Sequence, residues 1–316
     1  MVLVLKVLSL RKAVNSLAIS TSAIACLELM KTVEAKNIER FRNRVFEHML
    51  RTRGWKYRVF LRYLKIFKYV AFAPTRGEFL ESYYVLMRYL DDIVDGDAPL
   101  PNGYPDESSY ISEKIEFSQN PVKPKDEVDY LMLHCFELAA RFNEGFQSET
   151  QDILNSLLFD ANRRDKKIIF PEKQLMHHFH LLDIRGTIQA TLKIFKEDPE
   201  KYRLLEPLGV ACRYQYDIED IDTDLAAGYI NISLEECEKL GISRDDLKDT
   251  SSVKIRRWLL QRAYDGLQLL EKHHQNLEQG QFSLLSRMTF RLVYESPARK
   301  TFNQIISESK EQGINE

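Results

Sequence analysis

The sequence predicts an all-α protein. Apolar residues recur about every 3.6 residues along most of the chain, and few stretches alternate with the period of two that a β-strand shows. Of the 316 residues, 44% are hydrophobic, with 17 Phe and 15 Tyr among them, so a sizeable core or an apolar cavity can form. We expect one helical domain over residues 37–316, after an N-terminal extension over residues 1–36 to which the sequence assigns no certain role.

Several long stretches carry the helical period, and two interruptions separate them. The predicted helices are Ile38–Leu50, Trp55–Phe72, Glu78–Val94, Glu127–Arg141, Thr150–Asn162, Lys173–Phe195, Lys201–Leu225 and Val253–Gln275. The stretch Asp97–Pro124 is rich in Pro, Asn, Ser and Gly and predicts a long loop. A second, shorter break is expected over Ala226–Ser233.

The bulk composition excludes several classes of function. The 45 basic and 47 acidic residues leave a net charge of −2, which gives no electrostatic basis for binding nucleic acid. The 4 cysteines lie far apart and form no CxxC pair, so we expect reduced thiols in a cytoplasmic protein. No uncharged apolar run reaches the roughly 18 residues that a membrane-spanning helix needs.

The N-terminus leaves alternatives open. Residues 1–27 contain Lys6, Arg11 and Lys12 and no acidic residue. One interpretation is an organelle-targeting segment or a peripheral membrane contact. The favoured interpretations are an upstream start ahead of Met30 and an ordinary first helix.

A first acidic cluster ends the apolar helix that begins near Glu78. Asp91 and Asp95 are four residues apart, so both carboxylates project from one helix face, and Asp92 lies beside them. Like charges at this spacing repel, and the C-terminal end of a helix disfavours anions. A cation held between the carboxylates would remove the repulsion.

A second acidic cluster ends another apolar helix. Asp220 and Asp224 repeat the four-residue spacing, and Asp217 lies one turn earlier on nearly the same face. A single acidic run is ordinarily a solvated helix end. Two runs, each at the unfavourable end of an apolar helix, predict a metal site instead.

Two such helices facing each other would offer only hard oxygen ligands. Mg²⁺ prefers carboxylate and water oxygens, and it leaves positions open for the phosphates of a substrate. An allylic diphosphate bound there would ionise to a carbocation, which needs a dry, aromatic-lined cavity. The predicted Mg²⁺ ligands are Asp91, Asp92, Asp95, Asp217, Asp220 and Asp224.

Both clusters resemble the aspartate motifs of the squalene/phytoene synthase family. The stretch Tyr83–Asp95, YYVLMRYLDDIVD, is similar to the first motif without a gap and includes Arg88. The stretch from Leu208 to Ile230 is similar to the second motif, and the following segment up to Leu247 is similar in length. The resemblance covers roughly residues 55–300.

This resemblance implies the isoprenoid synthase fold, a class I terpenoid synthase bundle of helices around a central cavity. It also implies Mg²⁺-dependent head-to-head coupling of two farnesyl- or geranylgeranyl-type diphosphates. On this basis Asp91 and Asp95 would bind Mg²⁺ on one wall, and Asp220 and Asp224 on the other. The substrate-binding residues expected near them are Arg88, Tyr84, Arg213 and Tyr216.

The chain also departs from the family beside the retained aspartates. The family's Gln, Asn and Arg are here Arg213, Tyr216 and Glu219, its Arg after Gly228 is Tyr229, its Pro is Ser233, and its Ala-Gly pair is Asp183-Ile184. Helical periodicity places Arg213, Tyr216 and Asp217 on the cavity face and turns Glu219 toward a neighbouring helix. These changes favour ionisation of a diphosphate more strongly than head-to-head coupling.

Three functions follow in order of preference. The first is a prenyltransferase of the squalene/phytoene synthase type. The second is a terpene cyclase, or a transferase to another acceptor, that uses one prenyl diphosphate. The third is a non-catalytic family member that acts as an assembly factor, which the retained like-charge pairs disfavour.

Three other polar runs are expected to be structural. The histidines at positions 177, 178 and 180 lack the four-residue spacing of a metal pair and predict surface or cavity-lining side chains. The basic run 163–167 predicts a solvated loop, with a charge-donating lid as the alternative. His273-His274 predicts a solvated helix face.

Overall fold

The computed structural model describes residues 36–52, 55–70 and 74–313. The predicted N-terminal targeting or membrane segment, the alternative start at Met30 and Cys26 lie outside these residues. Every regular element within them is a helix, which confirms the predicted all-α class. No helix of this described part is long and apolar enough to cross a membrane.

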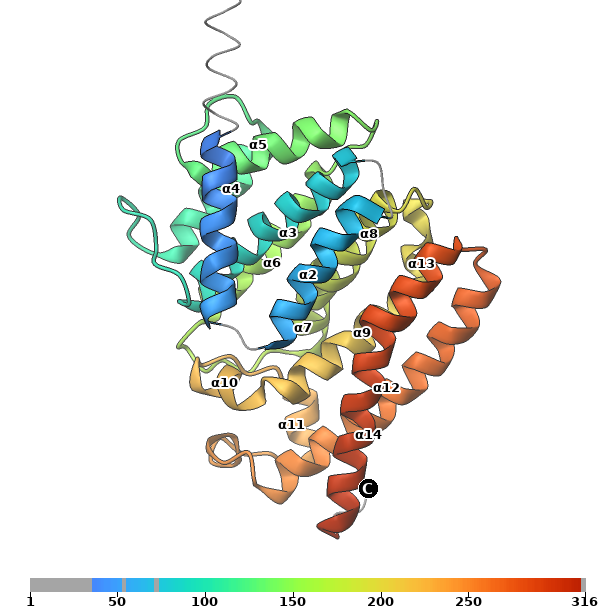
Figure 1. Cartoon of the computed structure of the whole chain (residues 1–316). Coiled ribbons are helices and arrows are strands. Elements are labelled where there is room, and N and C mark those ends of the chain that lie inside the picture. Colours follow the sequence, from blue (N-terminus) through green and yellow to red (C-terminus); the bar gives the residue numbers. More distant parts are fainter. Residues whose placement is uncertain (1–35, 53–54, 71–73, 314–316) are drawn as a thin grey trace, which may run out of the picture.

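The first half of the chain packs around α3 (Figure 1), whose apolar side is almost completely buried. Helix α3 contacts α2, α5 and α6, and a core of Phe, Leu, Ile and Val side chains fills the space between them. The helices of this half are residues 36–52, α2 (Trp55–Val70), α3 (Pro74–Asp95), α4 (Glu107–Gln119), α5 (Glu127–Ala140) and α6 (Gln147–Arg163).

The second half packs around α9, which lies against α12, α14 and η1 (Figure 1). A second core, which includes Trp258 and Phe302, fills this region. The elements are α7 (Glu172–Phe179), the π-helix η1 (His180–Ile188), α8 (Gln189–Ile194), the 3₁₀ turn η2 (Pro199–Lys201), α9 (Tyr202–Glu219), α10 (Ile221–Ala226), α11 (Leu234–Leu240), the 3₁₀ turn η3 (Asp246–Lys248), α12 (Val253–Gln279), α13 (Leu284–Thr289), the π-helix η4 (Phe290–Glu295) and α14 (Ser296–Glu311).

The prediction of one long loop over residues 97–124 is wrong, because α4 lies within it. The side chain of Asp106 caps this helix by accepting a hydrogen bond from the Ser109 N–H at 2.7 Å. Tyr110 and Ile111 are fully buried in the first core. The proline-rich flanks concealed a short amphipathic stretch that tertiary burial stabilises.

The helix predicted over Lys201–Leu225 is also broken, and the break falls at Asp220. This residue has φ −109° and ψ 7°, so α9 ends before it and α10 begins after it. The stretch Lys173–Phe195 continues through three elements, with π-helical geometry from His180 to Ile188. Both irregularities lie where acidic side chains gather.

Gly266 controls how closely α12 and α14 approach. A Cβ atom at this position would overlap the ring of Phe302, which is fully buried. We therefore expect Gly266→Ala to destabilise the fold by about 1–3 kcal/mol through overpacking. Chemical denaturation measures the change, with Gly145→Ala as the control, because Gly145 is exposed and meets only the flexible Gln147 side chain. Equal stability of the two variants would contradict this packing role.

Candidate active site at the acidic motifs

The first acidic motif occupies the C-terminal end of α3. Arg88 forms an ion pair with Asp91 (Nη1 to Oδ2, 2.6 Å) and with the buried Asp92 (Nη2 to Oδ1, 2.7 Å). Arg88 thus orients the first two aspartates, whereas its expected contact with substrate stays a prediction. Burial, then the charge of Asp91 and more weakly that of Asp160, raises the pKa of Asp95 to about 8, against the opposing effect of Arg88.

The second motif is divided between α9 and α10. Asp217 is buried and accepts hydrogen bonds at Oδ1 from Arg213, with Nε and Nη2 both at 2.9 Å. Within the described residues its Oδ2 is buried and has no hydrogen-bond partner. Burial raises the pKa of Asp224 to about 7, opposed by Arg213 and reinforced by Asp220 and Asp217.

A chain of hydrogen bonds connects α6 to the second motif. Asp160 Oδ1 accepts from Arg163 Nε at 2.7 Å, and Arg163 Nη1 donates to Asn231 Oδ1 at 2.8 Å. Asn231 Nδ2 then donates to Asp224 Oδ2 at 2.8 Å. Burial alone would raise the pKa of Asp160, but His178 and Arg163 outweigh it and hold that pKa well below its usual range.

Asp183 joins the two motifs electrostatically. It lies in the π-helix η1, and burial raises its pKa to about 7; Arg213 opposes the rise, and Asp217, Asp160 and Asp91 add to it. The charges of both motifs therefore act on one carboxyl group. Asp183 Oδ2 is buried without a hydrogen-bond partner in the described part of the chain. In the sequence Asp183 stands out as a departure from the family's Ala and as the end of the histidine run that begins at His177, and neither signal placed it among the predicted site residues.

The basic run 163–167 lies between the two motifs. Asp165, Lys166 and Lys167 are exposed, as predicted for a solvated loop, whereas Arg163 is buried and Arg164 half-buried. Arg164 Nη1 donates to the Val94 carbonyl oxygen at 2.9 Å, at the end of α3. The Asp165 N–H donates to the Ala227 carbonyl oxygen at 3.0 Å, just after α10. Gly228, with φ +83°, allows the Asp165 backbone to approach so closely. The loop thus joins the ends of α3 and α10.

The aromatic residues that the sequence placed at the cavity take different positions. Tyr84 is half-buried and forms an edge-to-face contact with Phe60 at 4.9 Å between ring centroids. Tyr216 is 41% exposed, so it does not line an enclosed space as expected. The Arg213 guanidinium lies over the Phe179 ring at 4.7 Å and near the Tyr216 ring at 5.8 Å.

Two other predictions of position can be compared directly. Glu219 accepts a hydrogen bond at 2.6 Å from Thr301 on α14, which confirms that it faces a neighbouring helix. His178 is buried, and its Nδ1 lies 2.8 Å from Ser156 Oγ, while its Nε2 lies 3.3 Å from Asp160 Oδ1. It is therefore neither a surface nor a cavity-lining residue, and it orients Asp160 instead.

A cavity of about 260 Å³ opens between α7, η1 and α9, beside Arg213 and Asp183. Its rim carries Lys173, His177 and His180, so these two histidines line a cavity as predicted. None of the predicted metal ligands lines it. A larger cavity, about 400 Å³, lies elsewhere, between α12 and α14.

Within the described ranges, no group of three His, Cys, Asp or Glu side chains is arranged to hold a metal ion. The Mg²⁺ site therefore stays a prediction, but the residues fit the ion chemically. The available donors are hard carboxylate oxygens, and the buried Oδ2 atoms of Asp183 and Asp217 have no hydrogen-bond partner in this region. Burial, and then neighbouring carboxylates, raise the pKa values of Asp95 and Asp224 despite the opposing arginines, and a bound cation would favour their charged forms.

Comparison with known proteins identifies the fold. No protein-family model and no curated protein sequence matches the chain. Among solved structures, the squalene synthase HpnC from Alicyclobacillus acidocaldarius is similar, with a TM-score of 0.62 and 17% identity over 90% of this chain and 97% of that one. A dehydrosqualene synthase solved with a ligand has a TM-score of 0.58 and 14% identity over 88% of this chain and 98% of that one. This likeness confirms the predicted isoprenoid synthase fold.

The raised pKa of Asp95 predicts a pH-dependent stability. Between the ordinary carboxyl pKa near 4 and about 8, folded Asp95 keeps a proton that the unfolded chain has lost, so stability falls as pH rises through this window. Asp95→Asn should flatten this decline and raise the melting temperature above pH 8 in buffer containing a chelator. Thermal unfolding across the pH range measures it. The control Asp245→Asn, at an exposed carboxylate, should keep the wild-type slope, and an equal slope in Asp95→Asn would contradict the assignment.

Proposed function

We propose that this protein is a Mg²⁺-dependent prenyltransferase that ionises an allylic isoprenoid diphosphate. Head-to-head coupling of two such diphosphates, as in squalene/phytoene synthases, is the first candidate reaction. The observation that carries the proposal is the effect of carboxylates from both motifs, Asp91 and Asp217, on the single carboxyl group of Asp183. This convergence occurs on an isoprenoid synthase fold.

In this proposal Asp91 and Asp95 hold Mg²⁺ from α3, and Asp220 and Asp224 hold it from the second motif. Bound Mg²⁺ would neutralise the diphosphate leaving group and lower the barrier to breaking its C–O bond. Arg88 fixes the orientation of Asp91 through their 2.6 Å ion pair.

The remaining residues hold the second wall in place. Asn231 fixes one oxygen of Asp224, and Arg163 fixes Asn231. The Arg163 guanidinium also lies over the ring of the buried Tyr229 at 4.9 Å. A cation therefore stands beside the position where the family has an arginine, although the side chain at that position is now aromatic. Arg163 would balance charge near the diphosphate from a different element.

A second candidate reaction uses one prenyl diphosphate, with cyclisation or transfer to another acceptor. The observation that favours it is the pair Arg213 and Asp183, which places two ionisable side chains where the family has Gln and Ala beside the second motif. Charged groups there would disfavour a second apolar prenyl chain, because a buried charge needs a polar partner.

We expect Asp91→Asn and Asp220→Asn each to lower diphosphate release by more than about 100-fold, since each removes a carboxylate from the metal site. Release of inorganic diphosphate from farnesyl diphosphate measures the activity. A second measurement is the rise in melting temperature when Mg²⁺ and inorganic diphosphate are added together, which both variants should lose. Asp222→Asn is the matched control, because Asp222 is an exposed carboxylate of the same motif that accepts a hydrogen bond from Thr250. Activity within a few-fold of wild type in both variants would refute the site.

The reaction products distinguish the two candidates. The full-length protein would be incubated with Mg²⁺ and, in turn, with geranyl, farnesyl and geranylgeranyl diphosphate, and the organic products identified by mass spectrometry. Head-to-head coupling gives a product with twice the carbon number of the prenyl group, and this is the expected result. Cyclised, hydrolysed or acceptor-linked products with a single prenyl unit would instead support the second candidate reaction and rule out head-to-head coupling.

A further inference from the structure

Three large apolar side chains form an exposed line along α13 and η4. Leu284 is 67% exposed, Met288 49% and Leu292 64%, and successive members are four residues apart, so they share one side of the continuous helix. Single exposed apolar residues are ordinary on protein surfaces, but a contiguous row of them indicates an interaction site. We call these residues the apolar row.

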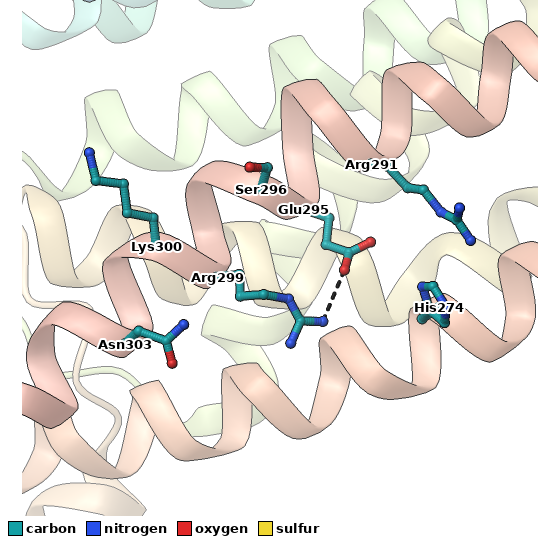
Figure 2. Close-up of a pocket in the computed structure, with 7 residues that line it drawn as sticks. All are labelled: His274, Arg291, Glu295, Ser296, Arg299, Lys300 and Asn303. Carbon is teal, nitrogen blue, oxygen red and sulfur yellow. Dashed lines mark hydrogen bonds and ion pairs between the residues drawn. The ribbon is translucent and has the colours of Figure 1, made fainter.

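The 400 Å³ cavity, whose lining residues Figure 2 shows, involves the part of the chain that follows the apolar row in sequence. Its residues are His274 from α12 and Arg291, Glu295, Ser296, Arg299, Lys300 and Asn303 from η4 and α14. Ser296 and Lys300 continue the four-residue spacing that begins at Leu284. The apolar row and the cavity therefore occupy one continuous strip of the same helical segment.

This segment is strongly basic. From Leu284 to Asn303 the chain has four cations, Arg287, Arg291, Arg299 and Lys300, and one acid, Glu295, for a local net charge of 4 − 1 = +3. Glu278 and Glu271 on α12 pair with Arg291 and Arg299, so the surface as a whole keeps a net charge of 4 − 3 = +1, and this excess attracts anions.

The cavity keeps unused hydrogen-bond donors. Arg299 is bound by Glu271 and Glu295, and Arg291 Nη2 is bound by Glu278 at 3.2 Å. Among the described residues, the buried Nε of Arg291 has no hydrogen-bond partner. Lys300 is exposed and forms no ion pair with any described residue. Arg291 and Lys300 lie at opposite ends of the cavity (Figure 2), so each would take its own phosphate group as an acceptor.

His273 lies behind the cavity, close to the positively charged side chains that line it. His273 is fully buried, and neither ring nitrogen has a hydrogen-bond partner in the described structure, so the prediction of a solvated His273 is wrong. Burial lowers its pKa to about 4, and the charges of His274, Arg291 and Arg299 add to that effect. His273 therefore stays neutral and leaves the cations of the cavity as the charges that an anion meets.

We propose that this strip docks on an anionic phospholipid bilayer. Headgroup phosphates bind at the two ends of the cavity, one at Arg291 and one at Lys300, and the apolar row lies among the upper parts of the acyl chains. A helix with an apolar side next to several Lys and Arg residues is the composition of a membrane-surface anchor. A stable protein interface, by contrast, is depleted in Lys and buries about 800 Å² on each partner, more than three side chains supply. Figure 1 shows α13 far from α10, so docking leaves the acidic motifs free.

Vesicle sedimentation tests the proposal with the full-length protein and without substrate. We expect binding to vesicles of phosphatidylcholine mixed with phosphatidylglycerol and much weaker binding to phosphatidylcholine alone, with a decline at high salt. Lys300→Gln should lower the partition coefficient about five-fold. Leu284→Ser and Met288→Ser should each lower it about ten-fold. The matched controls, Lys310→Gln on α14 and Val253→Ser at the exposed start of α12, should bind as wild type does.

Several outcomes would overturn the proposal. The proposal is wrong if Lys300→Gln and Leu284→Ser bind vesicles as wild type does. It is also wrong if the controls Lys310→Gln and Val253→Ser lose as much vesicle binding as these variants. If inorganic phosphate stabilises the wild type but not Lys300→Gln, and no vesicle binds, the cavity takes a free anion instead. If Leu284→Ser changes the oligomeric state in light scattering, the row is covered by a second copy of the chain. Vesicle binding requires neither Mg²⁺ nor prenyl diphosphate, so Asp91→Asn should retain it even if the proposed reaction is wrong.

Discussion

Carboxyl groups from α3, α6, η1, α9 and α10 lie close enough at one end of the bundle to shift one another's pKa values, and their mutual repulsion determines what the neighbouring residues must do. Burial strengthens the repulsion, because charges interact more strongly where water is excluded. Burial first, and then the charges of neighbouring carboxylates, raise the pKa values of Asp95, Asp183 and Asp224 to about 8, 7 and 7. A fold that keeps such a group together needs positive charge at each point where two acids approach.

Arginine side chains supply that charge from two kinds of position. Arg88 and Arg213 lie one turn before their aspartates on the same helix, so helical geometry alone makes these ion pairs. Arg163 and Arg164 come from the loop after α6 and reach both motifs, one through Asn231 and the other through the Val94 carbonyl oxygen. The first pair stabilises each motif separately. The second pair fixes the distance between the motifs, which no contact within a single helix can do.

The parts of this arrangement that depend on neighbours in sequence could be predicted from the sequence. Strong periodicity identified α3, α5 and α9, and the four-residue spacing of the aspartates identified the acidic ends. The break at Asp220 and the buried His178 depend on contacts between distant segments, so periodicity gave no sign of them. Composition was misleading for α4, because its Pro-rich flanks concealed a helix whose stability comes from burial. Asp160, Arg163 and Asn231 were missed as a unit for the same reason, since they are joined only in space.

The Arg213 group limits what the second motif can bind. Burial alone would lower the pKa of Arg213, but Asp217 and Asp183 outweigh it and raise that pKa above its usual value. Arg213 is therefore permanently charged, and its withdrawal would leave two buried carboxylates without a counter-ion, which is far more costly than the loss of an exposed pair. A diphosphate could recruit Arg213 only if a metal ion took its place beside Asp217. Of the predicted ligands in this motif, Asp217 is thus the one already neutralised within the protein, and Asp224, held by the neutral Asn231, is better suited to receive a cation. If the proposed Mg²⁺ binds the second motif, the ion pair of Arg213 with Asp217 favours Asp224, on the α10 side, over Asp217 as its ligand.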